Sequence, residues 1–536
     1  MQLQKIRFSD TKSFSQFFLD YIENKERLTP FFDQYPALVN FNSSLTKKSQ
    51  SFLLEQRQIL VSVLKKQYDG IQHEIVHRQI QSLSDGKTFT VTTGHQLNIF
   101  TGPLYFIYKI VTVINTCREL KKKYPTFNFV PVYWMASEDH DYDEMNYFRL
   151  NGKKYTWETD QKGAVGRFKT IGFDKLLNEL PGDTSIFREA YTGNEVLSDA
   201  VRQYVHSLFG NEGLVVIDAD NHELKRQFSN VMRDDILQQR TITHVEKTNK
   251  ELEKLGYKTQ IHCREINFFY LDTNLRTRIE KSDDGFSAVD TGLTFTEKEM
   301  LSIIEDVPEK LSPNVILRPL YQEMILPNLA YVGGPAEVIY WLQLKRVFDQ
   351  YNVPFPVLMP RNFGMVVDHV VDRKLRKTGM AVETFFETKN YLFNEWISVN
   401  TRHDLTVGKE RDLISRSFDE LRLKASSIDP TLTPFVSAET KRALNGLEKL
   451  EKKLLRAEKR VHSEKLRQIE EVKDALFPNG NLQERTDNFL NFYQRDADFI
   501  KALLLNFDPF DFRFNILIYP SHDESRSAEA ISSETK

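Results

Sequence analysis

The sequence predicts an α/β protein with a doubly wound parallel sheet, two insertions in that sheet and a C-terminal α-helical coiled coil. Three observations support this fold class. Apolar runs of strand length recur in the first 360 residues, and polar or glycine residues and then a helical pattern follow them. Short, polar, glycine-containing stretches interrupt this alternation twice. Beyond about residue 380, leucines at heptad spacing replace the strands.

Length and composition restrict the classes of protein that fit. A chain of 536 residues is too long for one hydrophobic core. A formal net charge of −3 gives no electrostatic reason to expect nucleic acid as a partner. The two cysteines, Cys117 and Cys263, cannot form a disulfide framework. An N-terminal signal region and a run of 18 apolar residues are both missing, so we expect a cytoplasmic protein that does not bind a membrane.

Changes of pattern divide the chain into eight predicted segments. They are an N-terminal helical region (1–85), the first half of the core (86–150), a first connecting insertion (151–205), a return to the core (206–239), a second connecting insertion (240–311), the second half of the core (312–380), a helical coiled-coil dimerisation domain (381–510), and a C-terminal strand with a disordered tail (511–536). We place the strand at 514–519 and the tail at 521–536.

The core is expected to contain five parallel strands. They are predicted at 89–93, 129–135, 214–220, 329–333 and 355–359. A helix at 103–120 connects the first two strands and makes a right-handed βαβ unit with them. Another helix is predicted at 197–209.

The last third of the chain predicts a coiled-coil arm. The heptad positions are Leu447, Leu450, Leu454, Ala457 and Val461, and the seam then shifts to Leu466, Ile469, Val472 and Leu476 before Pro478. Such an apolar stripe predicts a homodimer, with an intramolecular helical hairpin as the competing explanation. A second helix at 482–505 is expected to fold back on the arm.

The first candidate site follows the strand at 89–93, where neutral polar side chains lead into the crossover helix. Its residues are Gly94, His95, Gln96, Asn98, Thr101 and Gly102. Glycine permits close approach of a ligand to the backbone, and the neutral side chains can donate to an anionic group near a helix N-terminus. The P-loop lysine pattern and the G-x-G-x-x-G pattern are both missing. A polar loop that satisfies its own backbone is the alternative.

The second candidate site is the acidic run Ser137–Glu144, which follows the strand at 129–135. Asp139 or Asp141 can recognise an amine or a hydroxyl group, and a carboxylate or His140 can act as a general base. Two alternatives remain open. Ser137 can cap a helix whose first turn favours acidic residues, and the Asp and His side chains can instead hold a metal ion.

The third candidate site lies where the strand at 329–333 ends in a glycine turn and a helix start. Its residues are Gly333, Gly334 and Glu337, with Arg318 and Gln322 upstream and Arg361 and Asn362 after the next strand. Backbone N–H groups near a helix N-terminus suit a phosphate or a carboxylate. A tight turn that requires glycine explains the glycines but not the polar residues. We expect all three sites to meet in one crevice at the switch point of the sheet.

These motifs together resemble one family. The matching stretches are Thr93–Gln96, Thr101–Tyr105, Pro131–Asp141, Leu317–Leu320, Gln322 and Leu326–Pro335. In order and spacing they are similar to the signature of the cysteine ligases of bacillithiol biosynthesis (BshC). The coiled coil agrees as well, so the resemblance covers nearly the whole chain.

The resemblance implies a Rossmann-like core akin to class I nucleotidylyl transferases and aminoacyl-tRNA synthetases, with two connecting insertions and a dimerising coiled coil. The implied reaction joins cysteine to the amine of glucosaminyl malate as an amide, with an adenine nucleotide (ATP or ADP) as cofactor and no structural metal. Residues 94–98 stand where the synthetases carry His-x-Gly-His, and a Lys-Met-Ser-Lys-Ser loop is missing. The choice between adenylation and phosphorylation of cysteine therefore stays open.

The leading hypothesis is an ATP-using amide ligase in which Asp139, His140 or Asp141 acts on the attacking amine. His95 is a further catalytic candidate. One alternative is a metal-assisted hydrolase built on Glu138–Glu144, which metal analysis of the purified protein would reveal. Another is a non-catalytic coiled-coil protein with a vestigial nucleotide site, which would show no turnover with cysteine, ATP and glucosaminyl malate.

Overall fold

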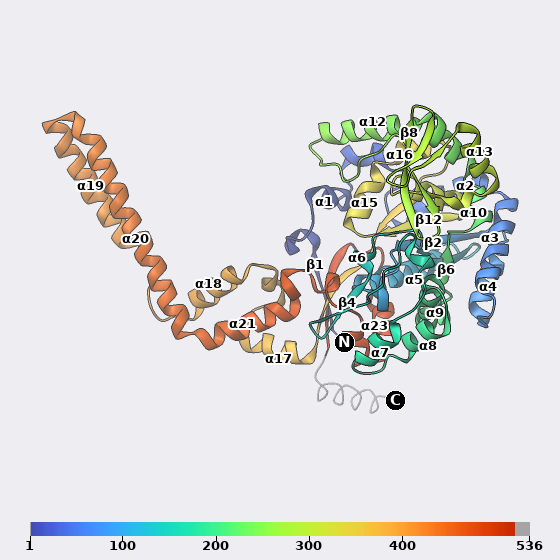
Figure 1. Cartoon of the computed structure of the whole chain (residues 1–536). Helices are drawn as coiled ribbons and strands as arrows, with labels where there is room; N and C mark the ends of the chain where they lie inside the picture. Colours follow the sequence, from blue (N-terminus) through green and yellow to red (C-terminus); the bar gives the residue numbers. More distant parts are fainter. Residues whose placement is uncertain (1, 520–536) are drawn as a thin grey trace, which may run out of the picture. The chain divides into compact units, whose positions relative to one another are not determined.

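The computed structural model describes residues 2–519 (Figure 1). These residues form two compact units. The first comprises mainly residues 3–365 and 481–517, and the second comprises mainly residues 366–480. Within the described range, we find no helix that is both long enough and apolar enough to span a bilayer. The tail predicted at 521–536 lies outside the described residues.

A five-stranded parallel sheet forms the centre of the first unit. Its strands, in spatial order, are β13 (Val357–Pro360), β12 (Asn328–Gly333), β2 (Thr88–His95), β3 (Asn128–Met135) and β6 (Val215–Asp218). All neighbouring pairs are parallel. The strand order reverses between β2 and β12, because β3 and β6 extend the sheet on one side while β12 and β13 extend it on the other. The predicted doubly wound sheet is confirmed, and its switch point lies between β2 and β12.

The strands form where the sequence is apolar and β-branched, because helices cover the sheet and leave its strands buried. Helix α5 (Tyr105–Lys123) follows β2, and α15 (Pro335–Leu342) follows β12. Cys117 on α5 lies in a fully apolar cluster that includes Phe89 and Phe129. Burial raises the pKa of the Cys117 thiol. Cys117 is therefore a core residue and not a reactive thiol.

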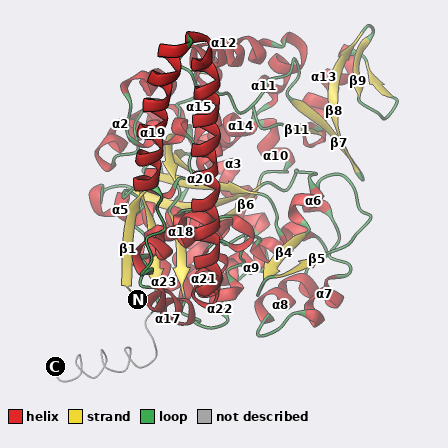
Figure 2. Cartoon of the chain, turned by 90° about the vertical axis from the view of Figure 1, so that its left-hand side faces the viewer, coloured by secondary structure: helices red, strands yellow, loops and turns green. Residues whose placement is uncertain are grey.

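The first insertion begins with a short hairpin, β4 (Tyr147–Leu150) and β5 (Lys153–Thr156) (Figure 2). Asn151 and Gly152 at its turn both have positive φ, 51° and 78°, as the tight hairpin turn requires. Three helices follow: α7 (Phe173–Glu179), α8 (Ser185–Gly193) and α9 (Leu197–Phe209). Glycine-containing sequence such as Asn151–Gly152 is typical of a hairpin turn, and α9 has the bounds expected from the sequence.

The second insertion contains an antiparallel sheet and two helices, α12 (Arg240–Lys254) and α13 (Glu297–Asp306). The strand order is β10 (Leu293–Phe295), β9 (Gly285–Ala288), β8 (Leu275–Ser282), β7 (Phe268–Asp272) and β11 (Leu311–Pro313). Of these, only β7 coincides with a continuous apolar run in the sequence, Phe268–Leu271. The apolar pattern of the others is weak, because β8, β9 and β10 are partly exposed and β10 and β11 have only three residues each.

The first 85 residues are mainly helical, as predicted. Their α-helices are α1 (Gln16–Ile22), α2 (Phe41–Ser51), α3 (Leu54–Gln67) and α4 (Glu74–Ser82). The sequence did not reveal the strand β1 (Gln2–Arg7), which pairs with β15 (Arg513–Ile518); β15 in turn pairs with β14 (Phe363–Val367). The strand predicted at 514–519 is β15.

The second unit is helical. Its α-helices are α17 (His369–Thr378), α18 (Lys389–Asn400), α19 (Gly408–Ile428), α20 (Thr433–Val461) and α21 (Ser463–Leu476). Helices α19 and α20 run side by side as a hairpin (Figure 1). The helix breaks at His462, where the leucine seam shifts. Beyond this break, Leu466 and Leu476 are buried where α21 packs against α17 and α18. The predicted coiled coil therefore consists, within one chain, of α19 and α20.

The prediction that a helix at 482–505 folds back on the arm is wrong. This stretch belongs to the first unit and contains the short helices α22 (Leu490–Tyr493) and α23 (Phe499–Asn506). There the Asn115 side chain on α5 donates to the Leu504 carbonyl at 3.0 Å and to the Phe507 carbonyl at 2.7 Å. Helix α23 packs on α5 within the first unit.

One partly buried carboxyl group, that of Asp487, predicts a pH dependence of stability. Burial raises the pKa of Asp487 to about 7, although Arg495 opposes the shift. Because an unfolded Asp titrates near pH 4, the penalty for its ionised form grows between about pH 4 and pH 7. We expect Asp487→Asn to raise the free energy of unfolding by about 2 kcal/mol at pH 8 and hardly at all at pH 4. Urea unfolding at both pH values measures this, and an equal gain at both would contradict it.

Candidate active site

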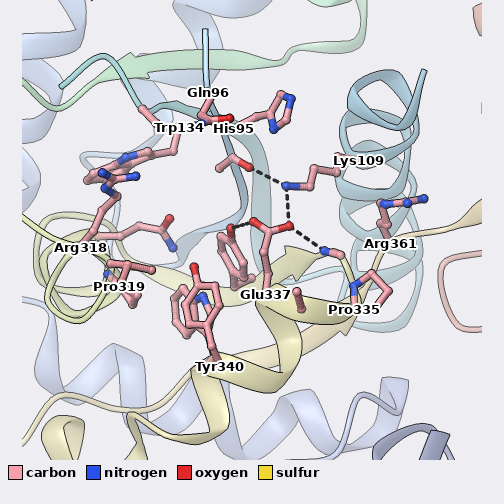
Figure 3. A pocket seen from close by; sticks show the side chains of 18 of the residues that line it. His95, Gln96, Lys109, Trp134, Arg318, Pro319, Pro335, Glu337, Tyr340 and Arg361 are labelled. Carbon is pink, nitrogen blue, oxygen red and sulfur yellow. Dashed lines mark hydrogen bonds and ion pairs between the residues drawn. The ribbon is translucent and has the colours of Figure 1, made fainter. Parts of the chain in front are cut away.

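A cavity of about 390 Å³ opens at the carboxyl ends of β2, β3 and β12, beside the switch point (Figure 3). Sheets of this topology bind ligands at this place. The structure brings residues of all three predicted sites together here. The predicted residues that line the cavity are Gly94, His95, Gln96, Asp139, Arg318, Gln322, Gly334, Glu337 and Arg361.

The remaining predicted residues do not line the cavity. They are Asn98, Thr101, Gly102, His140, Asp141, Gly333 and Asn362. Several of them stabilise the backbone nearby. The Asn98 side chain donates to the Glu144 carbonyl at 3.0 Å, and the Asn362 side chain donates to the Asp508 carbonyl at 2.8 Å. Thr101 and Gly102 form a turn with positive φ, 69° and 61°. We infer that these residues shape the surroundings of the cavity.

The sequence did not reveal a second set of lining residues, which is aromatic and cationic. These residues are Tyr105, Lys109, Trp134, Tyr331, Tyr340, Trp341 and Arg485. The aromatic residues follow apolar patterns, in which core packing is the ordinary interpretation. Lys109 could have been found from the sequence, because it is the one charged residue in the mainly apolar run 104–114 of a buried helix.

Lys109 connects the two helices that follow the switch-point strands. Its Nζ lies 2.6 Å from Glu337 Oε2 and donates to the Gly94 carbonyl at 2.8 Å. Glu337 also accepts from the Tyr331 hydroxyl at 2.6 Å and from the Gly334 N–H at 2.8 Å (Figure 3). The Lys109 side chain is only 3% exposed. Burial lowers the pKa of Lys109, and Glu337 opposes this shift.

His95 and Arg361 lie close to this ion pair. The Nε2 atom of His95 is buried and has no hydrogen-bond partner among the described residues. Burial lowers the pKa of His95 well below its usual value, and the charges of Lys109 and Arg361 add to the effect. His95 is therefore neutral at pH 7. Arg361 was predicted to contact an anion, but its Nη atoms already bind Glu484 at 2.6 and 3.1 Å.

Asp139 is the residue of the acidic run that lines the cavity. Its carboxylate accepts from the His140 N–H at 2.8 Å, and it lies 3.9 Å from Arg318 Nη1 and 3.4 Å from Gln96 Nε2. Burial alone would raise the pKa of Asp139, but Arg318 and Arg276 outweigh it and lower the pKa. The carboxylate is therefore ionised at neutral pH and available as a hydrogen-bond acceptor.

Arg276, on β8, connects the second insertion to the same loop. Its Nη1 lies 2.6 Å from His140 Nδ1, and its guanidinium lies 3.8 Å from the centre of the Phe269 ring. One candidate ligand atom from each of Asp139, His140 and Asp141 lies within 4.8 Å of the others, which is close enough for a shared metal ion. A cation there would meet the guanidinium groups of Arg276 and Arg318. The charges therefore do not favour the metal-site alternative.

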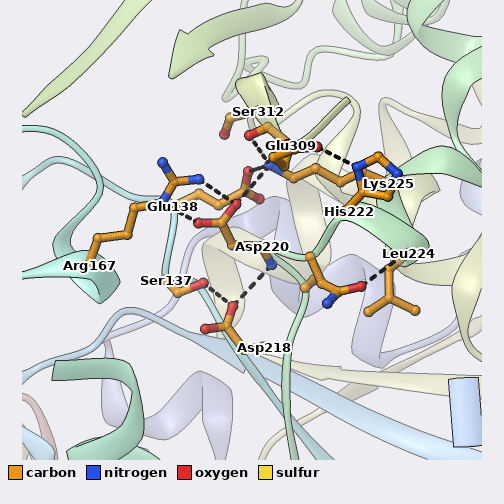
Figure 4. A network of polar contacts seen from close by, with 12 residues as sticks. Ser137, Glu138, Arg167, Asp218, Asp220, His222, Leu224, Lys225, Glu309 and Ser312 are labelled. Atoms are coloured by element: carbon orange, nitrogen blue, oxygen red, sulfur yellow. Dashed lines mark hydrogen bonds and ion pairs between the residues drawn. The ribbon is translucent and has the colours of Figure 1, made fainter. Parts of the chain in front are cut away.

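Glu138 lies in a buried ionic network (Figure 4). Lys225 Nζ lies 2.5 Å from Glu138 Oε1 and 3.0 Å from Asp220 Oδ1, and Arg167 Nε lies 2.7 Å from Asp220 Oδ2. The Ser137 hydroxyl donates to the Asp218 carboxyl group (Figure 4). Ser137 therefore does not cap a helix, and the network fixes the loop that carries Asp139 to the loop that follows β6.

Comparison with known proteins agrees with this fold and site. The N-terminal Rossmann-like domain of the bacillithiol biosynthesis protein BshC matches residues 1–362, and its C-terminal coiled-coil domain matches residues 364–519. Several relatives bear the name "Putative cysteine ligase BshC", among them one from Cytophaga hutchinsonii and two from flavobacteria. The one from Cytophaga hutchinsonii is 39% identical over 518 residues, covering 96% of this chain and 99% of the relative.

The other two come from flavobacteria. The Flavobacterium psychrophilum protein is 40% identical over 500 residues, covering 91% of this chain and 94% of the relative. The Flavobacterium johnsoniae protein is 38% identical over 524 residues, covering 96% of this chain and 99% of the relative. These names confirm the prediction of a ligase enzyme. The chain therefore belongs to the BshC family of bacillithiol biosynthesis.

Proposed function

We propose that this protein joins cysteine to glucosaminyl malate, forming an amide between the cysteine carboxyl group and the sugar amine after ATP-dependent activation. The observation that carries the proposal is the cavity at the switch point, which places an ionised carboxylate, Asp139, among fixed cations and aromatic walls. The names of the relatives support cysteine as one substrate.

The charges in the cavity suit anionic substrates. Its lining contains the cations Lys109, Arg318, Arg361 and Arg485 and the anions Asp139 and Glu337. Fixed cations in a recessed site attract carboxylates and phosphates and stabilise negative charge that develops during a reaction. Both the malate group and a nucleotide carry such charges.

An adenine nucleotide fits the chemistry of these residues. The buried His95 Nε2 and Arg361 Nε atoms have no partner among the described residues, so a ligand with polar groups can use them. Arg318 and Arg485 would hold its phosphates, and the aromatic rings offer stacking surfaces. When bound, ATP would supply the leaving group that activates the cysteine carboxyl group.

Asp139 would act on the attacking sugar amine. The amine nitrogen forms a bond to the activated carbonyl carbon, the leaving group departs with the bonding electron pair, and the nitrogen loses a proton to the Asp139 carboxylate. Gln96 and Arg318 hold that carboxylate at the cavity wall. His140 and Asp141 are exposed and lie outside the lining, which makes Asp139 the better candidate.

A turnover assay tests the proposal. Purified protein is incubated with cysteine, ATP and glucosaminyl malate, and each substrate is omitted in turn. Mass spectrometry should detect the amide only in the complete mixture, and the nucleotide product, AMP or ADP, identifies the activation step. If folded protein forms no amide, the proposal is wrong. Stoichiometric zinc or manganese in the protein would favour the hydrolase alternative.

We also propose that the α19–α20 hairpin forms a homodimer. Its leucines stay exposed within one chain, with Leu421 at 49% and Leu450 at 48%. We expect light scattering at micromolar protein to give twice the chain mass of 62.8 kDa. The double variant Leu421→Glu with Leu450→Glu should be a monomer. Leu505→Glu is the control, because Leu505 on α23 is 77% exposed and lies outside the hairpin, and this variant should remain a dimer. A monomeric wild-type protein would contradict the proposal.

A further inference from the structure

We propose that the Lys109–Glu337 ion pair is the binding subsite for the zwitterionic head group of an α-amino acid. The ammonium group of the ligand would bind Glu337, and its carboxylate would bind Lys109. This inference rests on the proposed function, because it assigns the amino-acid substrate to one part of the cavity.

Both members of the pair have hydrogen-bonding capacity left. The Lys109 ammonium has three N–H groups, and its described contacts, to Gly94 and Glu337, use two of them. The Glu337 carboxylate has about four acceptor positions, and Tyr331, Gly334 and Lys109 use three. Lys109 and Glu337 both line the cavity, so a ligand there can reach the remaining donor and acceptor.

The place of the pair in the fold also indicates a ligand. Lys109 lies on α5 and Glu337 on α15, and these helices follow the two strands that flank the switch point. Glu337 accepts from the Gly334 N–H at the N-terminus of α15, and this contact does not require a lysine. A buried lysine costs desolvation free energy, and an ion pair alone often fails to offset that cost. A binding role accounts for keeping both charges at the cavity wall.

Charge balance favours a zwitterion over an anion or a cation. Each charge of a zwitterion can face one residue of opposite sign, so the site stays electrically balanced when the ligand binds. Lys109 Nζ and Glu337 Oε2 are only 2.6 Å apart. An anion bound to Lys109 would therefore also lie close to the Glu337 carboxylate, and a cation bound to Glu337 would also lie close to the Lys109 ammonium. The site should therefore discriminate by the combination of charges and not by total charge.

The cavity can also separate the two amines of the proposed reaction. Asp139 and Glu337 are its two carboxylates, on the loop after β3 and on α15. If Glu337 holds the α-ammonium group of cysteine, Asp139 remains available for the sugar amine. Gly94 keeps the wall open beside this subsite, because a Cβ atom there would lie 3.3 Å from the Tyr331 hydroxyl.

Calorimetric titration of the nucleotide-free protein tests the subsite with three ligands. They are L-cysteine, cysteamine, which lacks the carboxylate, and 3-mercaptopropionate, which lacks the ammonium group. We expect Glu337→Gln to weaken cysteine and cysteamine binding at least tenfold and to leave 3-mercaptopropionate binding unchanged or stronger. Lys109→Met should weaken cysteine and 3-mercaptopropionate binding at least tenfold and leave cysteamine binding unchanged or stronger. Lys66→Met, which removes an exposed ion pair with Glu223, is the matched control and should change nothing.

A double variant covers the case in which a single charge left in the cavity prevents folding. Lys109→Met with Glu337→Gln leaves no unpaired charge, and it should fold and still bind cysteine at least tenfold more weakly. Three results would each overturn the subsite. They are equal losses of affinity for all three ligands in the single variants, normal cysteine binding by the double variant, and no cysteine binding by the wild type at millimolar concentration. Amide formation by the wild type is a separate result, so the proposed function can fail or hold independently.

Discussion

Replacing Asp139 with Asn is expected to lower the rate of amide formation by about 100-fold or more, the usual loss when a general base is removed. Because the carboxylate acts on the amine mainly in the transition state, the fall should appear in kcat, with little change in the KM for cysteine. Asn preserves the size of the side chain and one acceptor oxygen. Steady-state kinetics of the variant measure both parameters.

Asp141→Asn is the matched control. Asp141 is exposed, stands at the N-cap of the short helix α6 (Tyr142–Met145) and lies outside the cavity lining. We expect nearly normal turnover and at most a small fall in melting temperature from this change. Normal turnover of the Asp139 variant, or an equal loss in both variants, would contradict the assignment of Asp139.

Replacing Glu484 with Gln is expected to lower the free energy of unfolding by about 3–5 kcal/mol, because it leaves Arg361 as an unpaired buried cation. The two side chains are 2% and 0% exposed, and Glu484 also accepts from the Gly364 N–H at 2.9 Å. Thermal and urea unfolding measure the loss.

The control for this experiment is an exposed ion pair. Glu305 lies 2.8 Å from Arg233, and both side chains are about half exposed, at 58% and 42%. Glu305→Gln should change the free energy of unfolding by less than about 1 kcal/mol. A similar loss of unfolding free energy in the two variants would show that the buried Arg361–Glu484 pair stabilises the protein no more than an exposed pair does.

The sequence was most informative where local pattern and burial agree. The continuous apolar run of β3 and the amphipathic run of α9 predicted both elements, because each pattern follows from the faces that these elements bury. The three glycine-containing or acidic motifs were predicted to meet because parallel strands end at the same edge of a sheet. The cavity lining shows that they do.

What the sequence could not reveal depends on pairing between distant segments. Strand β1 pairs with a strand some 500 residues later, and its own six residues are too short and too polar to show a pattern. Arg276 and Arg485 reach the acidic loop and the cavity from the second insertion and from the segment after the arm. Their roles follow from tertiary contacts, and local sequence does not encode these.

Amide formation is expected to take place in the cavity, between Asp139 and Glu337. A crystal structure of the protein with the cysteinyl-glucosaminyl malate product tests this most directly. We expect the product in the cavity, with the amide nitrogen within hydrogen-bond distance of Asp139 and the cysteine ammonium group at Glu337. A product bound at another place, with the cavity free of it, would contradict the account.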